Sequence, residues 1–102
     1  MYIYNITFNV EESIKNEWKD YVKNIFIPKM LQSGIIQSAT TSQIMVEEQQ
    51  GISYSIQFAT QDKKSLEKFK KAELYPILND LHLKFSPKMV FFATELDVID
   101  KQ

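Results

Sequence analysis

The chain of 102 residues contains no cysteine, a single histidine and only two glycines. Without cysteine it can form no disulfide framework, thiolate nucleophile or cysteine-based zinc site. One histidine, His82, cannot supply a histidine-based metal cluster. Glycine-rich phosphate loops and the H-E-x-x-H and G-x-S-x-G motifs are also missing. The sequence therefore predicts neither a metal nor a cofactor, and no local motif selects a catalytic residue.

Long apolar runs and a strong net charge are missing as well. No apolar run approaches the roughly 18 residues of a membrane span, and the first residues, "MYIYNITFNV", lack the basic and apolar regions of a secretory signal. The net charge of -1 gives no sign of a nucleic-acid or membrane-surface partner. We therefore expect a cytoplasmic protein that binds neither nucleic acid nor membrane.

The composition that remains is that of an ordinary globular protein, with 44% hydrophobic and 25% charged residues. A chain of this length suits one domain and buries roughly two-thirds of the surface that its unfolded form exposes. Because there are no repeats, low-complexity tracts or linkers, we expect a single domain over residues 1–102.

Four segments have the pattern of β-strands. Residues 2–10 alternate large apolar side chains at even positions with mostly polar ones at odd positions, and residues 52–59 repeat this alternation. Residues 35–46 form the other half of a predicted hairpin, whose turn is "EEQQG" at 47–51. Residues 88–99 form the last predicted strand.

Two segments have the pattern of amphipathic helices. The first begins near Glu11, Glu12 and Ser13, which supply charge and a cap, and the second begins at the cap Asp62. The apolar positions of the first are Ile14, Trp18, Tyr21, Val22 and Ile25, and those of the second are Leu66, Phe69, Leu74, Ile77, Leu78, Leu81 and Phe85. Pro28 and Pro76 interrupt these patterns, so we expect each helix to break there.

The element order βαββαβ predicts an α+β fold, the ferredoxin-like plait, with a four-stranded antiparallel sheet and both helices on one face. The apolar even positions of the central strands should face the helices. The odd positions from Ile3 to Asn9 and from Ser53 to Ala59 contain no charged residue. Charge depletion is typical of buried interfaces, although a short sample could lack charge by chance.

We therefore predict that this face pairs with the same face of a second subunit, giving a homodimer with the form of a dimeric α/β barrel. The candidate interface residues are Asn5, Thr7, Ser53, Ser55 and Gln57.

Two bent helices over one sheet would leave a gap in which a pocket could open. The candidate lining residues are Trp18, Tyr21, Phe26, Tyr54, Tyr75 and His82. Aromatic residues at helical spacing more often fill a core, and a single histidine more often lies on a helix surface than acts as a base or ligand. The sequence leaves both interpretations open for Trp18.

The chain also resembles a known family, the uncharacterised bacterial family called domain of unknown function 4286, within the dimeric α/β-barrel superfamily. The matching stretches are "YNITFNV" (4–10), "ESIKNEW" (12–18), "IPKML" (27–31), "GISYSIQF" (51–58), "HLKF" (82–85) and "ATELDVI" (93–99). The resemblance implies a ferredoxin-like monomer whose sheet packs on that of a second subunit. It implies no known reaction. The family pattern has a histidine and an arginine where this chain has Phe26 and Ala93.

Three classes of function fit the sequence. The first is a noncatalytic dimer that binds a small apolar ligand. The second is an enzyme related to the cofactor-independent monooxygenases, with substrate held beside Trp18, Tyr54 and His82. The third is an RNA-binding plait domain that uses Tyr4 and Tyr54 on an open sheet face. The third requires the polar odd positions to form the core, and we therefore rank it last.

Overall fold

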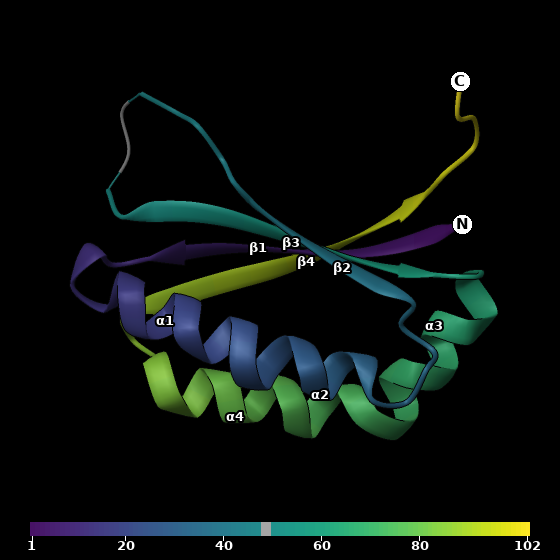
Figure 1. Cartoon of the computed structure of the whole chain (residues 1–102), viewed down its shortest axis with the longest axis horizontal. Coiled ribbons are helices and arrows are strands. Elements are labelled where there is room, and N and C mark those ends of the chain that lie inside the picture. The colour runs from purple at the N-terminus through teal and green to yellow at the C-terminus, as the bar shows by residue number, and fades with distance from the viewer. Residues whose placement is uncertain (48–49) are drawn as a thin grey trace.

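The structure, a computed structural model, describes residues 1–47 and 50–102. Four antiparallel strands form one sheet in the order β2–β3–β1–β4 (Figure 1). They are β1 (Tyr2–Val10), β2 (Ser38–Gln43), β3 (Ile52–Thr60) and β4 (Met89–Asp97). This order confirms the predicted ferredoxin-like arrangement, with the first and third strands in the centre. Two residues of the predicted hairpin turn, Glu48 and Gln49, lie outside the described residues.

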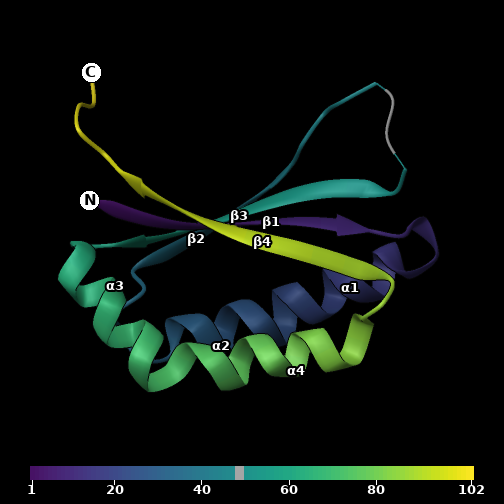
Figure 2. The same cartoon turned by 180° about the vertical axis from the view of Figure 1, so that it is seen from behind.

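The helices form one layer on a single face of the sheet, as the views from both sides show (Figures 1 and 2). They are α1 (Lys15–Tyr21), α2 (Ile27–Leu31), α3 (Lys63–Phe69) and α4 (Tyr75–Phe85). The even-numbered side chains of the central strands lie beneath them, as predicted. Those that are buried are Tyr4, Ile6, Phe8, Val10, Tyr54, Ile56, Phe58 and Thr60.

The two helical segments begin in different ways. At the second, the Asp62 carboxylate accepts a hydrogen bond from the backbone N–H of Ser65 at 2.8 Å, which confirms the predicted cap. At the first, a 3-10 turn at Glu12–Ile14 leads into α1 and no side chain caps it. The predicted cap among residues 11–13 is therefore wrong, because the 3-10 turn and the backbone hydrogen bond from Ile14 N–H to Glu11 carbonyl make the start.

The prolines do not break the helices, which corrects the sequence-based expectation. A π-helical segment at Val22–Phe26 joins α1 to α2, and another at Lys70–Leu74 joins α3 to α4. Each proline is then the second residue of the helix that follows. The N–H of Ile27 bonds to the Val22 carbonyl, five residues back. This wider turn carries the chain past a residue that has no N–H to donate.

The π-helical turns also keep one side of each helix against the sheet. The buried residues of the first helix recur every four positions: Ile14, Trp18, Val22, Phe26 and Met30. In a regular α-helix such a stripe would rotate by about 40° at each step. The π turn compensates for this drift, so Phe26 is buried and the predicted core residue Ile25 is 41% exposed. In the second helix, the π turn spans the five-residue step from Phe69 to Leu74.

A charged cluster ties the end of the sheet to the second helix. The Glu95 carboxylate on β4 accepts hydrogen bonds from the Lys70 ammonium at 2.8 Å and from the Tyr2 hydroxyl at 2.9 Å. The hydrogen bonds from Lys70 and then Tyr2 lower the pKa of Glu95, and the bond to Glu95 raises the pKa of Lys70. The Glu95 carboxylate therefore joins β1 and the second helical segment to β4.

We expect Glu95→Gln to lower the free energy of unfolding at neutral pH by about 0.5 to 1 kcal/mol, as for a partly exposed ion pair. Because the folded-state pKa of Glu95 is lowered, its contribution is present above the unfolded value near 4.5 and is lost as the pH falls through the folded value. Urea unfolding from about pH 7 to about pH 3 should therefore show the two proteins converging in acid. A constant difference across that range would contradict the ion-pair explanation.

Candidate functional site

A cleft of about 370 Å³ lies between the first helix and the β2 side of the sheet. Helix α1 and the π-helical segment form one wall, and β2 and β3 form the other. Its lining residues are Trp18, Lys19, Val22, Lys23, Ile27, Thr41 and Tyr54. The surface inside is mostly apolar, and the polar groups are few. Concave sites of this kind are typical of small-molecule binding.

Trp18 belongs both to the core and to the wall of this cleft. Its ring stacks on Tyr54 with centroids 4.6 Å apart and meets Phe8 edge-on at 5.2 Å. Its indole N–H points to the Met89 sulfur at 3.2 Å, and the residue has no exposed surface. The ring therefore packs against two aromatic side chains and its only donor is engaged, which fixes the position of Trp18 in the cleft wall.

Tyr54 brings an unsatisfied polar group to the same cleft. The side chain is 3% exposed, and its hydroxyl is buried without a hydrogen-bond partner among the described residues. Burial raises the pKa of the Tyr54 phenol, with Lys15 acting in the opposite direction, so the hydroxyl stays protonated at neutral pH. A buried hydroxyl without a partner costs about 1 to 3 kcal/mol. This cost is recovered if a molecule in the cleft supplies an acceptor.

Two lysines project from the helical wall of the cleft. Lys19 and Lys23 are both exposed and stand four residues apart. The Lys19 ammonium lies 5.8 Å from the centroid of the Tyr54 ring. The sequence interpretation did not select these lysines, because exposed lysines four residues apart are typical of any solvated helix surface.

Two other predicted lining residues lie in the core between the elements. Tyr21 is half-buried and meets Phe85 edge-on with centroids 5.5 Å apart, so it faces α4. Phe26 is 1% exposed and packs edge-on against Phe8 and Phe58 at 6.3 and 5.8 Å. Neither side chain lines the cleft beside Trp18.

The remaining two lie on the outer surface of α4. Tyr75 is 75% exposed, and His82 is exposed as well. The backbone carbonyl of His82 accepts a hydrogen bond from Ser86 N–H at the end of the helix. The structure therefore groups Trp18 and Tyr54 at one cleft and places Tyr75 and His82 apart from it.

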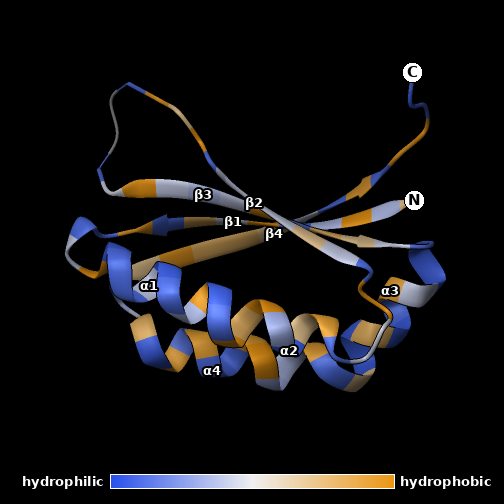
Figure 3. Ribbon diagram, in the orientation of Figure 1, coloured by the Kyte–Doolittle hydropathy of each residue, from blue (hydrophilic) through white to orange (hydrophobic). Residues whose placement is uncertain are grey.

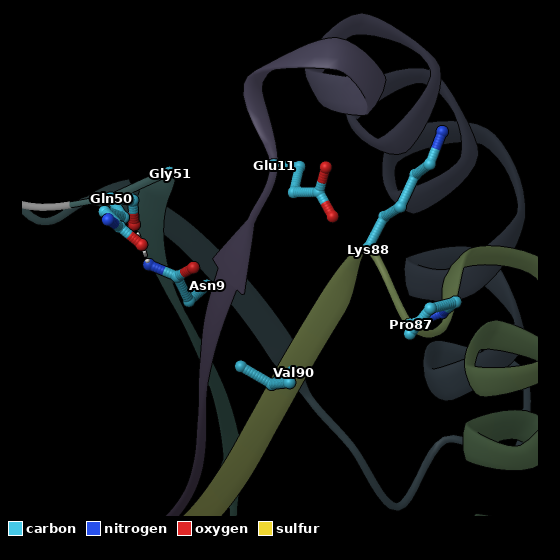
Figure 4. A pocket seen from close by; sticks show the side chains of 7 residues that line it. All are labelled: Asn9, Glu11, Gln50, Gly51, Pro87, Lys88 and Val90. Atoms are coloured by element: carbon cyan, nitrogen blue, oxygen red, sulfur yellow. Dashed lines mark hydrogen bonds between the residues drawn. The ribbon is translucent and has the colours of Figure 1, made fainter.

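A second hollow, of about 410 Å³, lies at one end of the sheet (Figure 4). Asn9 and Gln50 project on one side of it, and Glu11 and Lys88 on the other. The Asn9 amide already donates to the Gln50 carbonyl at 2.9 Å. A side chain at Gly51, whose φ is +75°, would place Cβ 2.8 Å from Asn9 Oδ1. The polar groups here serve the chain's own turn, so we place the candidate site in the apolar cleft.

The sheet face that no helix covers, here called the open face, carries no charged strand residue in the described part of the chain. The strand register places these side chains on it: Ile3, Asn5, Thr7, Asn9, Ser38, Thr40, Ser42, Ser53, Ser55, Gln57, Ala59, Val90, Phe92, Thr94 and Leu96. Phe92 and Val90 are each 63% exposed. The sequence interpretation covered only β1 and β3 and missed these apolar side chains of β4, which alternate with a period of two.

The predicted interface residues lie on the open face, and three of them, Asn5, Thr7 and Ser55, bond to one another. The Ser55 hydroxyl donates to Asn5 Oδ1 at 2.6 Å, and the Asn5 amide donates to the Thr7 hydroxyl at 3.2 Å. Asn9 donates to the Ser53 hydroxyl at 3.3 Å. Neutral groups that are already paired lose less than free ones when they leave water.

Two segments rise beside the open face, away from the helices (Figure 1). Residues 44–47 follow β2, and residues 98–102 form the C-terminal end. Figure 3 shows hydrophobic stretches in both. Met45 and Ile99 are 81% and 91% exposed. The apolar surface on this side of the sheet therefore extends beyond the strands themselves.

The family model described as domain of unknown function (DUF4286) matches residues 1–99. The chain belongs to this family. The match spans almost the whole chain and confirms the resemblance seen in the sequence. No curated protein matches the chain.

Solved structures share the fold of this DUF4286 protein at low sequence identity. An ethyl tert-butyl ether d family protein from Bacillus halodurans superimposes with a TM-score of 0.70 at 12% identity, over 95% of this chain and 100% of that one. A dimeric ferredoxin-like protein from an uncultured marine organism has a TM-score of 0.68 at 11% identity, over 99% and 97%. The cofactor-independent oxygenase SnoaB from Streptomyces nogalater superimposes with a TM-score of 0.67 at 9% identity, over 98% of this chain and 95% of that one. These likenesses establish the fold alone.

Within residues 1–47 and 50–102 of the DUF4286 protein, no three histidine or carboxylate side chains gather closely enough to hold a metal ion. In the same residues, no helix is long and apolar enough to cross a membrane.

We expect Tyr54→Phe to leave the free energy of unfolding unchanged or to raise it by up to about 1 kcal/mol in the absence of ligand, because it removes a buried hydroxyl that has no partner. Tyr2→Phe is the matched control and should lower stability, because the Tyr2 hydroxyl donates to Glu95. Urea unfolding of both variants measures this. A clear loss of stability in Tyr54→Phe would mean that the hydroxyl is already bonded in the free protein.

Proposed function

We propose that this protein is a small homodimeric binding protein whose monomers each hold a small, mostly apolar molecule in the cleft beside Trp18. The observation that carries the proposal is the combination of an apolar cleft with the buried hydroxyl of Tyr54, which has no partner among the described residues. Ligand sites typically pair an apolar wall with a few polar groups that fix orientation. The absence of cysteine fits a reducing compartment such as the cytoplasm.

The homodimer is inferred from the open face. Its strand residues are uncharged, and Val90, Phe92 and Leu96 expose apolar surface on β4. Large exposed apolar patches on soluble proteins usually mark interaction sites. A hollow of about 230 Å³ between β1 and β4 offers space for side chains of a second copy. Two of the solved structures with this fold are described as dimeric ferredoxin-like proteins.

A nucleic-acid partner finds less support. The RNA-binding alternative places Tyr4 and Tyr54 on an open sheet, where bases can stack on them. Both tyrosines instead lie beneath the helices, 5% and 3% exposed. Among the described strand residues, the open face offers no lysine to a phosphate backbone.

We expect light scattering to give about twice the chain mass of 12.0 kDa. Phe92→Glu should shift the protein to monomer or aggregate, because an unpaired charge in a dry interface costs several kcal/mol. Leu83→Glu is the matched control: Leu83 is 71% exposed on α4, on the helical side of the molecule, and its replacement should leave the mass unchanged. A monomeric wild-type protein, or equal effects of the two variants, would remove the case for pairing through the open face.

Ligand binding can be followed through Trp18, the only tryptophan in the chain. We expect titration with decanoate or 1-decanol to give a saturable change in Trp18 fluorescence. Thr41→Phe should abolish it, because Thr41 lines the cleft from an exposed position and the larger ring fills the space. Thr41→Ser keeps the cleft open and should still bind. No response to either compound, or an unchanged response in Thr41→Phe, would contradict the proposed site.

The oxygenase alternative rests on the shared fold with SnoaB, which covers 98% of this chain, and on the aromatic wall of the cleft. Oxygen uptake in the presence of quinols and other oxidisable aromatic compounds tests it. Turnover that Thr41→Phe abolishes would assign a reaction to the cleft. Binding without oxygen uptake would support the noncatalytic proposal.

A further inference from the structure

The cleft beside Trp18 has a polar end and an apolar end. Tyr54 and Lys19 form the polar end, where the Lys19 ammonium lies 5.8 Å from the Tyr54 ring centroid. Val22 and Ile27 follow along the helix and present aliphatic side chains. A molecule lying in the cleft would therefore meet donors at one end and hydrocarbon along its length.

The helical wall of the cleft carries positive charge that no carboxylate compensates. Lys29, Lys70 and Lys84 each form an ion pair with a carboxylate. Among the described residues, Lys19 and Lys23 have no carboxylate within 4.0 Å. The Tyr54 hydroxyl, buried and protonated, adds a neutral donor without a partner. An acceptor that carries negative charge is the preferred partner of ammonium and hydroxyl donors alike.

We propose that the natural ligand of this cleft is a small amphipathic carboxylate. Its carboxylate accepts hydrogen bonds from Tyr54 and pairs with Lys19 and Lys23, and its apolar body lies against Trp18, Val22 and Ile27. This inference rests on the proposed binding function and names the class of ligand. The volume of about 370 Å³ is near the lower end of the usual range, which limits the body to a medium chain or roughly one or two rings.

A carboxylate fits these donors better than a phosphate group does. Phosphates are usually bound by helix N-termini or loops with free backbone N–H groups. Lys19 and Lys23 stand in the middle of a continuous helical segment, where backbone N–H groups are used within the helix. The two oxygens of a carboxylate offer about four lone pairs, which is enough to accept hydrogen bonds from two ammonium groups and one hydroxyl.

The test compares two pairs of compounds that differ in charge but little in shape: decanoate with 1-decanol, and 2-naphthoate with 2-naphthamide. Calorimetric titration of the wild-type protein should show the carboxylate of at least one pair binding about tenfold more tightly than its neutral partner. Raising the sodium chloride concentration from about 50 to about 500 mM should weaken the binding of the carboxylate and leave the affinity for the neutral compound unchanged.

Three variants separate the donors. Lys19→Gln combined with Lys23→Gln should lower the affinity for the carboxylate about tenfold and leave the affinity for its neutral partner unchanged. Tyr54→Phe should lower the affinity for the carboxylate about fivefold while preserving the stability of the free protein. Lys64→Gln removes an exposed lysine of α3 outside the cleft and should change nothing.

The outcomes distinguish the two levels of the proposal. Equal affinities within both pairs, or tighter binding of the neutral compounds, would overturn the carboxylate inference while leaving an apolar binding site in place. Failure of all four compounds to bind would overturn the proposed function as well. Carboxylate binding that survives the double lysine substitution would show that the charge is recognised elsewhere.

Discussion

Both helical segments stay in contact with the sheet because each contains one π-helical turn. A stripe of buried residues with a spacing of four would rotate away from a flat surface if the helix were regular. The turn at Val22–Phe26 restores the alignment, so Trp18 and Met30 are both fully buried although they lie twelve residues apart. The second turn, at Lys70–Leu74, does the same after Phe69. The prolines that follow mark these turns without interrupting the helices.

This alignment also forms the cleft. Val22 begins the π-helical segment and faces the cleft, while Lys19 and Lys23 stand one turn apart on its exposed side. The stack of Trp18 on Tyr54 joins this helix to β3 and holds the Tyr54 hydroxyl in a buried position. Most buried polar side-chain groups have a hydrogen-bond partner. The unsatisfied state of the Tyr54 hydroxyl is the feature that separates this cleft from ordinary surface irregularity.

The two faces of the sheet follow from the same alternation. Even positions of β1 and β3 are apolar and lie under the helices, and odd positions are neutral and polar. The bonds among Asn5, Thr7 and Ser55 make the open face less costly to bury than a charged face. The exposed Val90 and Phe92 of β4 add the apolar surface that an interface needs.

The amino-acid sequence determined the fold to a large extent, because period-two and helical patterns are local and each is strong here. Strand β1 has the predicted bounds, Asp62 caps its helix, and the uncharged odd positions were visible before the structure. The site was less predictable. Trp18 and Tyr54 were selected for their aromatic character, but nothing in their spacing shows that they stack, and the lysines of the cleft resembled any solvated helix surface.

Only the tertiary structure decided the rest. The continuity of the helices past Pro28 and Pro76, the burial of Phe26 in place of Ile25, and the outward position of Tyr75 and His82 depend on how each helix is rotated against the sheet. A π-helical turn changes that rotation for every residue after it. Such a turn forms because packing on the sheet favours it, and this packing involves residues distant in the sequence, so the local pattern alone does not contain it.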